Sequence, residues 1–181
     1  VFSSPAVPRG FVDRQRELKE LMDWLVDQES GLLFLGGPAG RGKSYVASKL
    51  VEQVKQEGQW EVLWVDCAEP VLTLDVLLGG FALGLAGQLD KDDLFALTYP
   101  GVPGAMRERA LTKVLMRRKL LLVLDNYQEV RDRLVDDLLV RMCRDLPGLK
   151  LLIVGRERPE MVDAPTLPTG AVWEHRLRPL P

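Results

Sequence analysis

Residues 37–44 read Gly37-Pro38-Ala39-Gly40-Arg41-Gly42-Lys43-Ser44 and match the pattern G-x-x-x-x-G-K-[ST] at every fixed position. The apolar run Leu32–Gly36 precedes this stretch. The segment Tyr45–Val54 follows it with apolar side chains at helical spacing. Strand, glycine-rich loop and helix in this order form the context in which the pattern binds phosphate. The stretch therefore predicts a P-loop inside an α/β nucleotide-binding domain.

The chemistry of the P-loop follows from its residue types. Its glycines permit backbone conformations that turn successive N–H groups towards phosphate oxygens, and the helix that starts near Gly42 adds the positive end of its dipole. Lys43 is expected to reach the β- and γ-phosphates, and Ser44 to place its hydroxyl on Mg²⁺. The predicted nucleotide contacts within this stretch are Gly37, Pro38, Ala39, Gly40, Arg41, Gly42, Lys43, Ser44 and Tyr45.

Length and charge narrow the class of protein. The 181 residues suit one α/β domain, and 46% hydrophobic residues suffice for a core. A net charge of −2 gives no field that would draw the segment to nucleic acid or to an anionic membrane. No apolar run approaches the roughly 20 residues of a membrane span. Cys67 and Cys143 are interpreted as core residues of a cytoplasmic protein, and His175 as a strand residue without chemistry.

Hydrophobic periodicity predicts a three-layer α/β sandwich around a five-stranded parallel sheet. For a P-loop NTPase with these strands, the expected strand order is 2-3-1-4-5 in chain numbering. The strands are expected at 32–36, 60–66, 120–125, 149–154 and 171–177. Residues 71–89 are interpreted as a buried helix and 90–104 as a loop, because turn-forming residues fill 99–104. The expected division is an N-terminal arm at 1–10, a P-loop domain at 11–177, and the start of a linker at 178–181 to a further domain.

The run Leu120–Asp125 is typical of a Walker B strand, with apolar residues throughout and one aspartate at its carboxyl end. There Asp125 can hold Mg²⁺ beside Ser44. The alternative is a helix N-cap after a core strand. One whole strand lies between the two motifs, as expected for P-loop proteins with an additional strand.

The residue after Asp125 is Asn126, where many P-loop ATPases carry a second acid that positions the attacking water. An amide orients water but accepts a proton poorly, so we expect slow hydrolysis. Glu129 lies too far along the chain to substitute. Replacing Asn126 with Glu or Asp is expected to raise turnover.

Two further groups are candidates for the site. Arg156 follows the fourth strand, where a guanidinium can sense the γ-phosphate or stabilise transferred charge; the alternative is a surface loop arginine. Phe11 and Val12, with Arg14 nearby, precede an amphipathic helix and are candidates for an adenine pocket. The alternative is a helix that only covers the sheet, with Asp13 as its N-cap.

Together these landmarks resemble the STAND branch of AAA+-like ATPases, the signal transduction ATPases with numerous domains. Residues 11–18 resemble the F-x-G-R-E-x-E-L box of that group, although Asp13-Arg14-Gln15 departs from G-R-E. Residues 121–126 are similar to the Walker B of large bacterial transcription regulators of the antibiotic-regulator and LuxR types. Pro147-Gly148-Leu149 and Gly155-Arg156-Glu157 resemble their P-G-L and S-R-E stretches, and residues 178–181 the start of their next domain.

The resemblance implies an ATP/ADP switch in which ADP holds a closed form and ATP releases an open form able to form a homo-oligomer. It also implies winged-helix and sensor domains that follow in cis.

Other functions stay open on the residues alone. A working AAA+ ATPase acting on DNA or protein would need a strong catalytic acid and an arginine supplied in trans, for which Arg107, Arg109 and Arg158 are candidates. A small-molecule kinase would need a lid, which residues 71–104 could supply. A GTPase is disfavoured because no N-K-x-D motif occurs in the sequence.

Overall fold

The computed structural model describes residues 14–27, 31–68 and 71–178. Five strands form one parallel sheet: β1 (Leu32–Gly36), β2 (Glu61–Asp66), β3 (Leu120–Asp125), β4 (Leu149–Val154) and β5 (Val172–Arg176). The α-helices are α1 (Gln15–Val26), α2 (Lys43–Glu57), α3 (Leu74–Gly84), α4 (Lys91–Thr98), α5 (Gly104–Leu115) and α6 (Arg133–Asp145). Short 3₁₀ turns are η1 (Ala86–Gln88), η2 (Tyr127–Glu129) and η3 (Glu160–Asp163). Each strand lies within one residue of its expected position.

The strand order is β2-β3-β4-β1-β5, so the predicted order 2-3-1-4-5 was wrong in the placement of the first and fourth strands. β4 lies between the P-loop strand and the Walker B strand, and Leu151 pairs with Leu32 on one side and Leu122 on the other. All three strands are buried along their whole length, so their composition does not reveal which one is central. The observed order brings the end of β4 between the two motifs.

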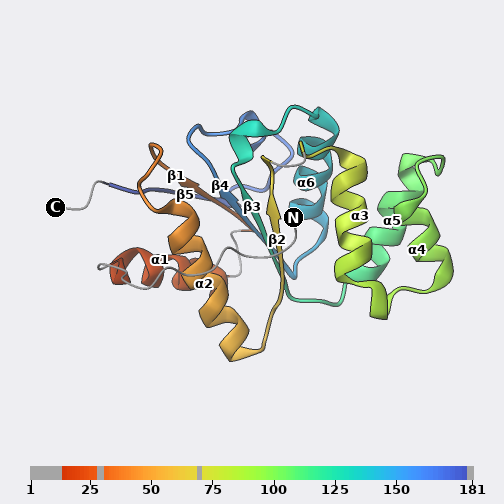
Figure 1. Cartoon of the computed structure of the whole chain (residues 1–181), viewed down its shortest axis with the longest axis horizontal. Helices are drawn as coiled ribbons and strands as arrows, with labels where there is room; N and C mark the ends of the chain where they lie inside the picture. Colours follow the sequence, from red (N-terminus) through yellow and green to blue (C-terminus); the bar gives the residue numbers. More distant parts are fainter. Residues whose placement is uncertain (1–13, 28–30, 69–70, 179–181) are drawn as a thin grey trace.

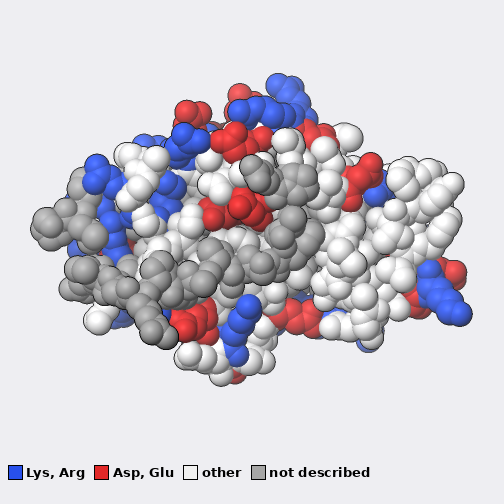
Figure 2. Space-filling model, in the orientation of Figure 1, with Lys and Arg blue, Asp and Glu red and all other residues white. Residues whose placement is uncertain are grey.

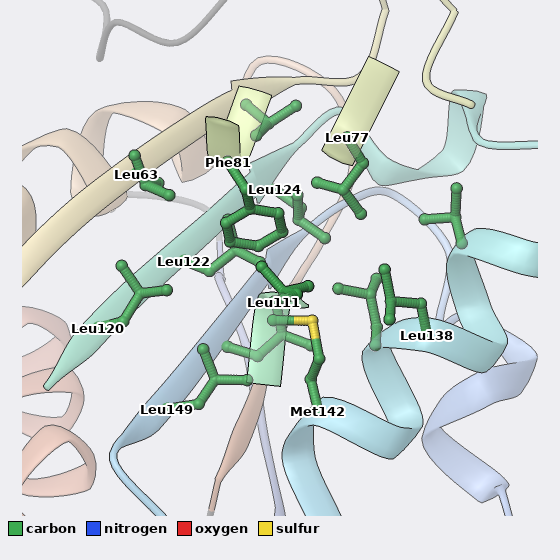
Figure 3. Close-up of a cluster of buried hydrophobic side chains, with 14 of the residues drawn as sticks. Leu63, Leu77, Phe81, Leu111, Leu120, Leu122, Leu124, Leu138, Met142 and Leu149 are labelled. Carbon is green, nitrogen blue, oxygen red and sulfur yellow. The ribbon is translucent and has the colours of Figure 1, made fainter. Parts of the chain in front are cut away.

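The predicted three layers are present (Figure 1): α1 and α2 cover one face of the sheet, and α3 to α6 lie on the other. Successive strand residues point to opposite faces, so Leu121 and Val123 pack with the first pair of helices, and Leu120, Leu122 and Leu124 with the second group. Figure 3 shows the larger core, where strand leucines meet side chains from three helices, labelled Phe81, Leu111, Leu138 and Met142. This packing fixes the strand ends that carry the site.

Residues 90–104 are not wholly a loop as expected, because helix α4 occupies Lys91–Thr98. Asp90 is its N-cap, with a side chain that accepts a hydrogen bond of 2.8 Å from the amide of Asp93. Asp92 and Asp93 add two carboxylates in the first turn. Asp90 is a typical N-cap residue in the sequence, but the glycines and prolines at 99–104 favour the prediction of a loop for the whole segment.

Gly148, in the turn before β4, packs closely against the backbone of Arg118. A Cβ atom built on Gly148 would lie 2.0 Å from the carbonyl oxygen of Arg118. We expect Gly148→Ala to lower the free energy of unfolding by about 1–3 kcal/mol, because the backbone must move to relieve the clash. Gly79→Ala in α3 is the control, since its Cβ would meet nothing within 4 Å and alanine favours helix. Urea denaturation of both variants measures the difference, and equal stabilities would contradict this packing.

Charged side chains of both signs share the surface drawn in Figure 2, and the part over α3 to α5 is mostly uncharged. Exposed apolar residues of that part include Leu83, Phe95 and Tyr99, and the last two rings stack with centroids 4.9 Å apart. Among the described residues, no helix has both the length and the apolar character needed to cross a bilayer.

Candidate nucleotide-binding site

The P-loop joins β1 to α2 through a backbone that only glycine adopts easily. Gly40 and Gly42 have φ of 74° and 80°, in the left-handed region, and Gly42 is the residue that precedes the first turn of α2. A side chain at either position would strain the loop even though open space surrounds both. The loop therefore presents the free N–H groups of the start of α2 to one point.

Lys43 is the first residue of α2, and its side chain is buried, with 9% of the residue exposed. Its ammonium group donates hydrogen bonds of 2.8 Å and 2.9 Å to the carbonyl oxygens of Gly37 and Pro38. Burial lowers the pKa of Lys43, the nearby charge of Arg156 lowers it further, and Asp125 opposes both. A phosphate anion in this place would favour the charged form of the lysine.

Ser44 joins the two motifs directly. Its hydroxyl donates a hydrogen bond of 3.0 Å to Oδ1 of Asp125, which also accepts one of 2.9 Å from the amide of Asn126. Asp125 is only 5% exposed. Burial raises the pKa of its carboxyl, and the two hydrogen bonds partly offset that effect. A buried carboxylate beside a hydroxyl is a pair of hard oxygen donors of the kind that Mg²⁺ prefers.

The motifs open into one cavity of about 630 Å³ at the carboxyl ends of the central strands. The P-loop and α2 contribute Ala39, Gly40, Gly42, Lys43, Ser44 and Tyr45; the end of β3 contributes Asp125, Asn126 and Gln128; and the end of β4 contributes Val154, Gly155 and Arg156. A cavity of this size at such strand ends is where α/β proteins bind ligands. No residue of 71–104 lines it, so the segment considered as a kinase lid lies away from it.

Arg156 lines the cavity, but its guanidinium group is paired with a neighbouring carboxylate. Nη2 donates a hydrogen bond of 3.0 Å to Oε1 of Glu129, and both side chains are well exposed. The main-chain N–H of Arg156 donates to Oε1 of Gln128 at 3.2 Å, which ties the end of β4 to the turn after β3. Gln128 was not predicted, since nothing in the sequence distinguishes it from other loop amides.

Three predicted P-loop contacts, Gly37, Pro38 and Arg41, do not line the cavity. The carbonyl oxygens of the first two accept from Lys43, and that of Arg41 accepts a hydrogen bond of 3.2 Å from Arg14. These residues shape the loop from behind.

Arg14 is buried behind the P-loop rather than exposed to the cavity. Its guanidinium donates to the carboxylate of Glu17 at 2.6 Å and to the carbonyl oxygen of Arg178 at 2.9 Å. Phe11, Val12 and Asp13 lie outside the described residues, so the adenine pocket remains a prediction. The prediction of Asp13 as N-cap was wrong by one position, because α1 begins at Gln15 and Arg14 is its N-cap.

Two of the three arginines considered for action in trans are engaged within the chain. Arg107 is buried and pairs with Asp75 at 2.5 Å, which ties α5 to α3. Arg158 pairs with Asp163 and with Glu174, the latter at 3.0 Å. Arg109 is exposed on α5.

His175 lies on β5 outside the nucleotide cavity, with Nδ1 2.8 Å from a carboxylate oxygen of Glu20 on α1. Cys67 and Cys143 are free thiols; Cys67 is in the core.

Comparison with known proteins gives one family and several solved structures of similar fold. A family model described as AAA domain matches residues 26–160. No curated protein matches the chain by sequence. Cdc6p from Pyrobaculum aerophilum superposes with a TM-score of 0.69 at 18% identity, over 96% of this chain and 48% of that one.

The similar solved structures include two others. A signal transduction ATPase with numerous domains (STAND) from Pyrococcus horikoshii, which has a tetratricopeptide repeat sensor, gives a TM-score of 0.59 at 17% identity, over 98% of this chain and 25% of that one. The Drosophila ORC structure with AT-rich DNA and Cdc6 gives 0.62 at 18%, over 90% and 53%. The chain therefore spans about half or less of each of these proteins, and it shares their fold.

Proposed function

The chain belongs to the AAA domain family, and from that premise we propose that it is the ATP- and ADP-binding switch module of a larger signalling or transcription-regulating protein of STAND type, with slow magnesium-dependent ATP hydrolysis. The hydrogen bond of 3.0 Å between Ser44 and Asp125 carries the proposal. It joins residues 81 positions apart at the mouth of one cavity, where a core strand alone would need neither group.

The residues present fit a magnesium ion bound with the nucleotide. Ser44 and Asp125 supply two hard oxygen donors, and phosphate oxygens and water would complete the octahedral set. Bound there, Mg²⁺ would neutralise charge on the phosphates. Lys43 would exchange its two carbonyl partners for phosphate oxygens, and the N–H groups at the start of α2 would bind the remaining oxygens.

Two features favour a slow switch over a rapidly cycling enzyme. The position after Asp125 carries an amide, which orients water without taking its proton. Arg156 is paired with Glu129, so it would have to leave that carboxylate to contact a γ-phosphate. We propose that this exchange reports the presence of the γ-phosphate to the rest of the protein.

The partners proposed for the switch are a winged-helix domain and a sensor domain in cis, and further copies of the protein when ATP is bound. The segment itself is proposed not to bind DNA, because its net charge is −2 and the charges drawn in Figure 2 are mixed in sign. A cytoplasmic location is proposed from its two free thiols.

Turnover tests the proposal. With saturating ATP and Mg²⁺, we expect kcat below about 0.1 s⁻¹, an order of magnitude under the usual lower range of enzymes, and no turnover in EDTA. Denaturation of freshly purified protein and chromatography of the released nucleotide complete the test. We expect the released nucleotide to be ADP, because a switch held in its closed form retains ADP during purification. A kcat above about 10 s⁻¹ would instead identify a cycling ATPase that works on DNA or protein.

A further inference from the structure

The backbone at Asn126 has an unusual conformation. Among the described residues it is the only non-glycine residue with positive φ, at φ 57° and ψ 38°. Asparagine and aspartate tolerate this left-handed region better than other side chains, whereas glutamate does not share that tolerance. The conformation turns the chain sharply after the Walker B strand and sets the direction of the Asn126 side chain.

The side chain of Asn126 has one occupied end and one free end. Nδ2 donates a hydrogen bond of 3.0 Å to Oδ1 of Asp66. Because an ionised carboxylate can only accept, this contact fixes which end of the amide is nitrogen. The amide oxygen accepts no hydrogen bond from any part of the chain that the structure describes, and Asn126 lines the nucleotide cavity. It is therefore an available acceptor at that wall.

Asp66 is itself held in place. It is the last residue of β2 and pairs in register with Asp125 at the end of β3. The same Oδ1 accepts a hydrogen bond of 3.0 Å from the main-chain N–H of Ala68. Asp66 does not line the cavity, so it reaches the site through Asn126. The strand beside the Walker B strand thus supplies a fixed carboxylate that contacts the side chain of the residue after Asp125.

We infer that Asp66 is a positioning residue for the proposed hydrolysis: its carboxylate holds the amide of Asn126 so that the amide oxygen accepts a hydrogen bond from the attacking water. This inference rests on the function proposed above. In the step, the water oxygen bonds to the γ-phosphorus as the bond to the bridging oxygen breaks, giving ADP and phosphate. The water proton passes to a phosphate oxygen, because an amide oxygen is too weak a base to take it.

The arrangement changes what an acid at position 126 should do. In Asn126→Asp the backbone is tolerated, but the new carboxylate faces Asp66 without a shared proton. In Asn126→Glu the longer side chain also loses the tolerance for positive φ. The double variant Asp66→Asn/Asn126→Asp exchanges acid and amide between the strands, so it keeps one donor and one acceptor in the contact.

We test the inference with Asp66→Ala, Asp66→Asn, the exchange variant, and Asp137→Ala as a control on the exposed face of α6. Asp66→Ala is expected to lower kcat about tenfold with the Kd for ATP unchanged, because the amide is no longer oriented. Asp66→Asn keeps an oxygen acceptor and should restore most of the turnover. The exchange variant should exceed wild type about tenfold, and Asn126→Asp alone should gain less. Asp137→Ala should match wild type.

The outcomes separate this inference from the proposed function. An unchanged kcat in Asp66→Ala overturns the inference. A fall in kcat that is equally large in Asp66→Ala and Asp66→Asn, and that comes with weaker ATP binding, overturns it as well. A wild-type chain that binds ATP without hydrolysing it contradicts the proposed turnover while Asp66 is intact. In that case the exchange variant is the test. Measurable hydrolysis by that variant supports a water bound by the side chain at position 126, and the absence of hydrolysis overturns the inference. The chemical shift of the ¹⁵N resonance of the Asn126 side-chain amide reports its hydrogen bond to Asp66. This shift should change in Asp66→Ala, because the substitution removes the hydrogen bond.

Discussion

Replacing Lys43 with alanine is expected to weaken ATP binding at least about 100-fold. A hydrogen bond to a charged group contributes about 1.5–3 kcal/mol, and each 1.4 kcal/mol corresponds to about tenfold in affinity. The ammonium group lies buried within the P-loop, where water screens it little. Isothermal titration of ATP with Mg²⁺ into wild type and Lys43→Ala measures the loss.

The matched control is Lys49→Ala on the same helix. Lys49 is half-buried, with 30% of its side chain exposed, and it pairs with Glu52 at 2.7 Å, a surface contact of little energetic weight. It should leave ATP affinity within about twofold of wild type. Folding without nucleotide should survive Lys43→Ala, because burial already disfavours the charge of this lysine and lowers its pKa. Equal affinities of wild type and Lys43→Ala would place the nucleotide elsewhere.

The second large effect is expected for Asp125→Asn. Its turnover should fall at least about 100-fold, as found when a buried group that stabilises developing charge is removed. The affinity for ATP should lose its dependence on Mg²⁺, since asparagine keeps an acceptor for Ser44 but lacks the negative charge that binds the cation. Titrations with and without EDTA compare this variant with the control Asp137→Asn. A variant that keeps its magnesium dependence would contradict the role of Asp125.

The same substitution should stabilise the empty fold. Burial raises the pKa of the Asp125 carboxyl, so folding penalises its ionised form. Stability therefore falls as the pH rises from the ordinary pKa of an aspartate towards the raised value, and the penalty persists at pH 7. In nucleotide-free, magnesium-free buffer at pH 7, Asp125→Asn should have a higher Tm than wild type. A site that binds ions at the expense of stability is common in functional proteins.

The sequence was sufficient for the elements whose signals are local. The P-loop and the apolar runs around it predicted β1 and α2, and the single aspartate after five apolar residues located the end of β3. The meeting of Ser44 with Asp125 followed from the rule that parallel strands end at one edge.

What the sequence could not supply is the lateral arrangement. Strands β1, β3 and β4 are all buried apolar runs, so nothing local shows that β4 lies in the middle. The contact between Asn126 and Asp66 depends on the pairing of β2 with β3 and on the backbone at position 126. The sequence places Glu129 too far along the chain to replace the missing acid, yet the 3₁₀ turn after β3 brings it to Arg156.

The most direct measurement is a calorimetric titration of ATP into nucleotide-free protein, with and without Mg²⁺. The account predicts one ATP per chain, bound more tightly in Mg²⁺ than in EDTA, with a Kd in Mg²⁺ near or below about 1 μM, the tight end of the range of enzyme KM values. No binding of ATP under either condition, or binding that Mg²⁺ leaves unchanged, would contradict a nucleotide site built on Lys43, Ser44 and Asp125.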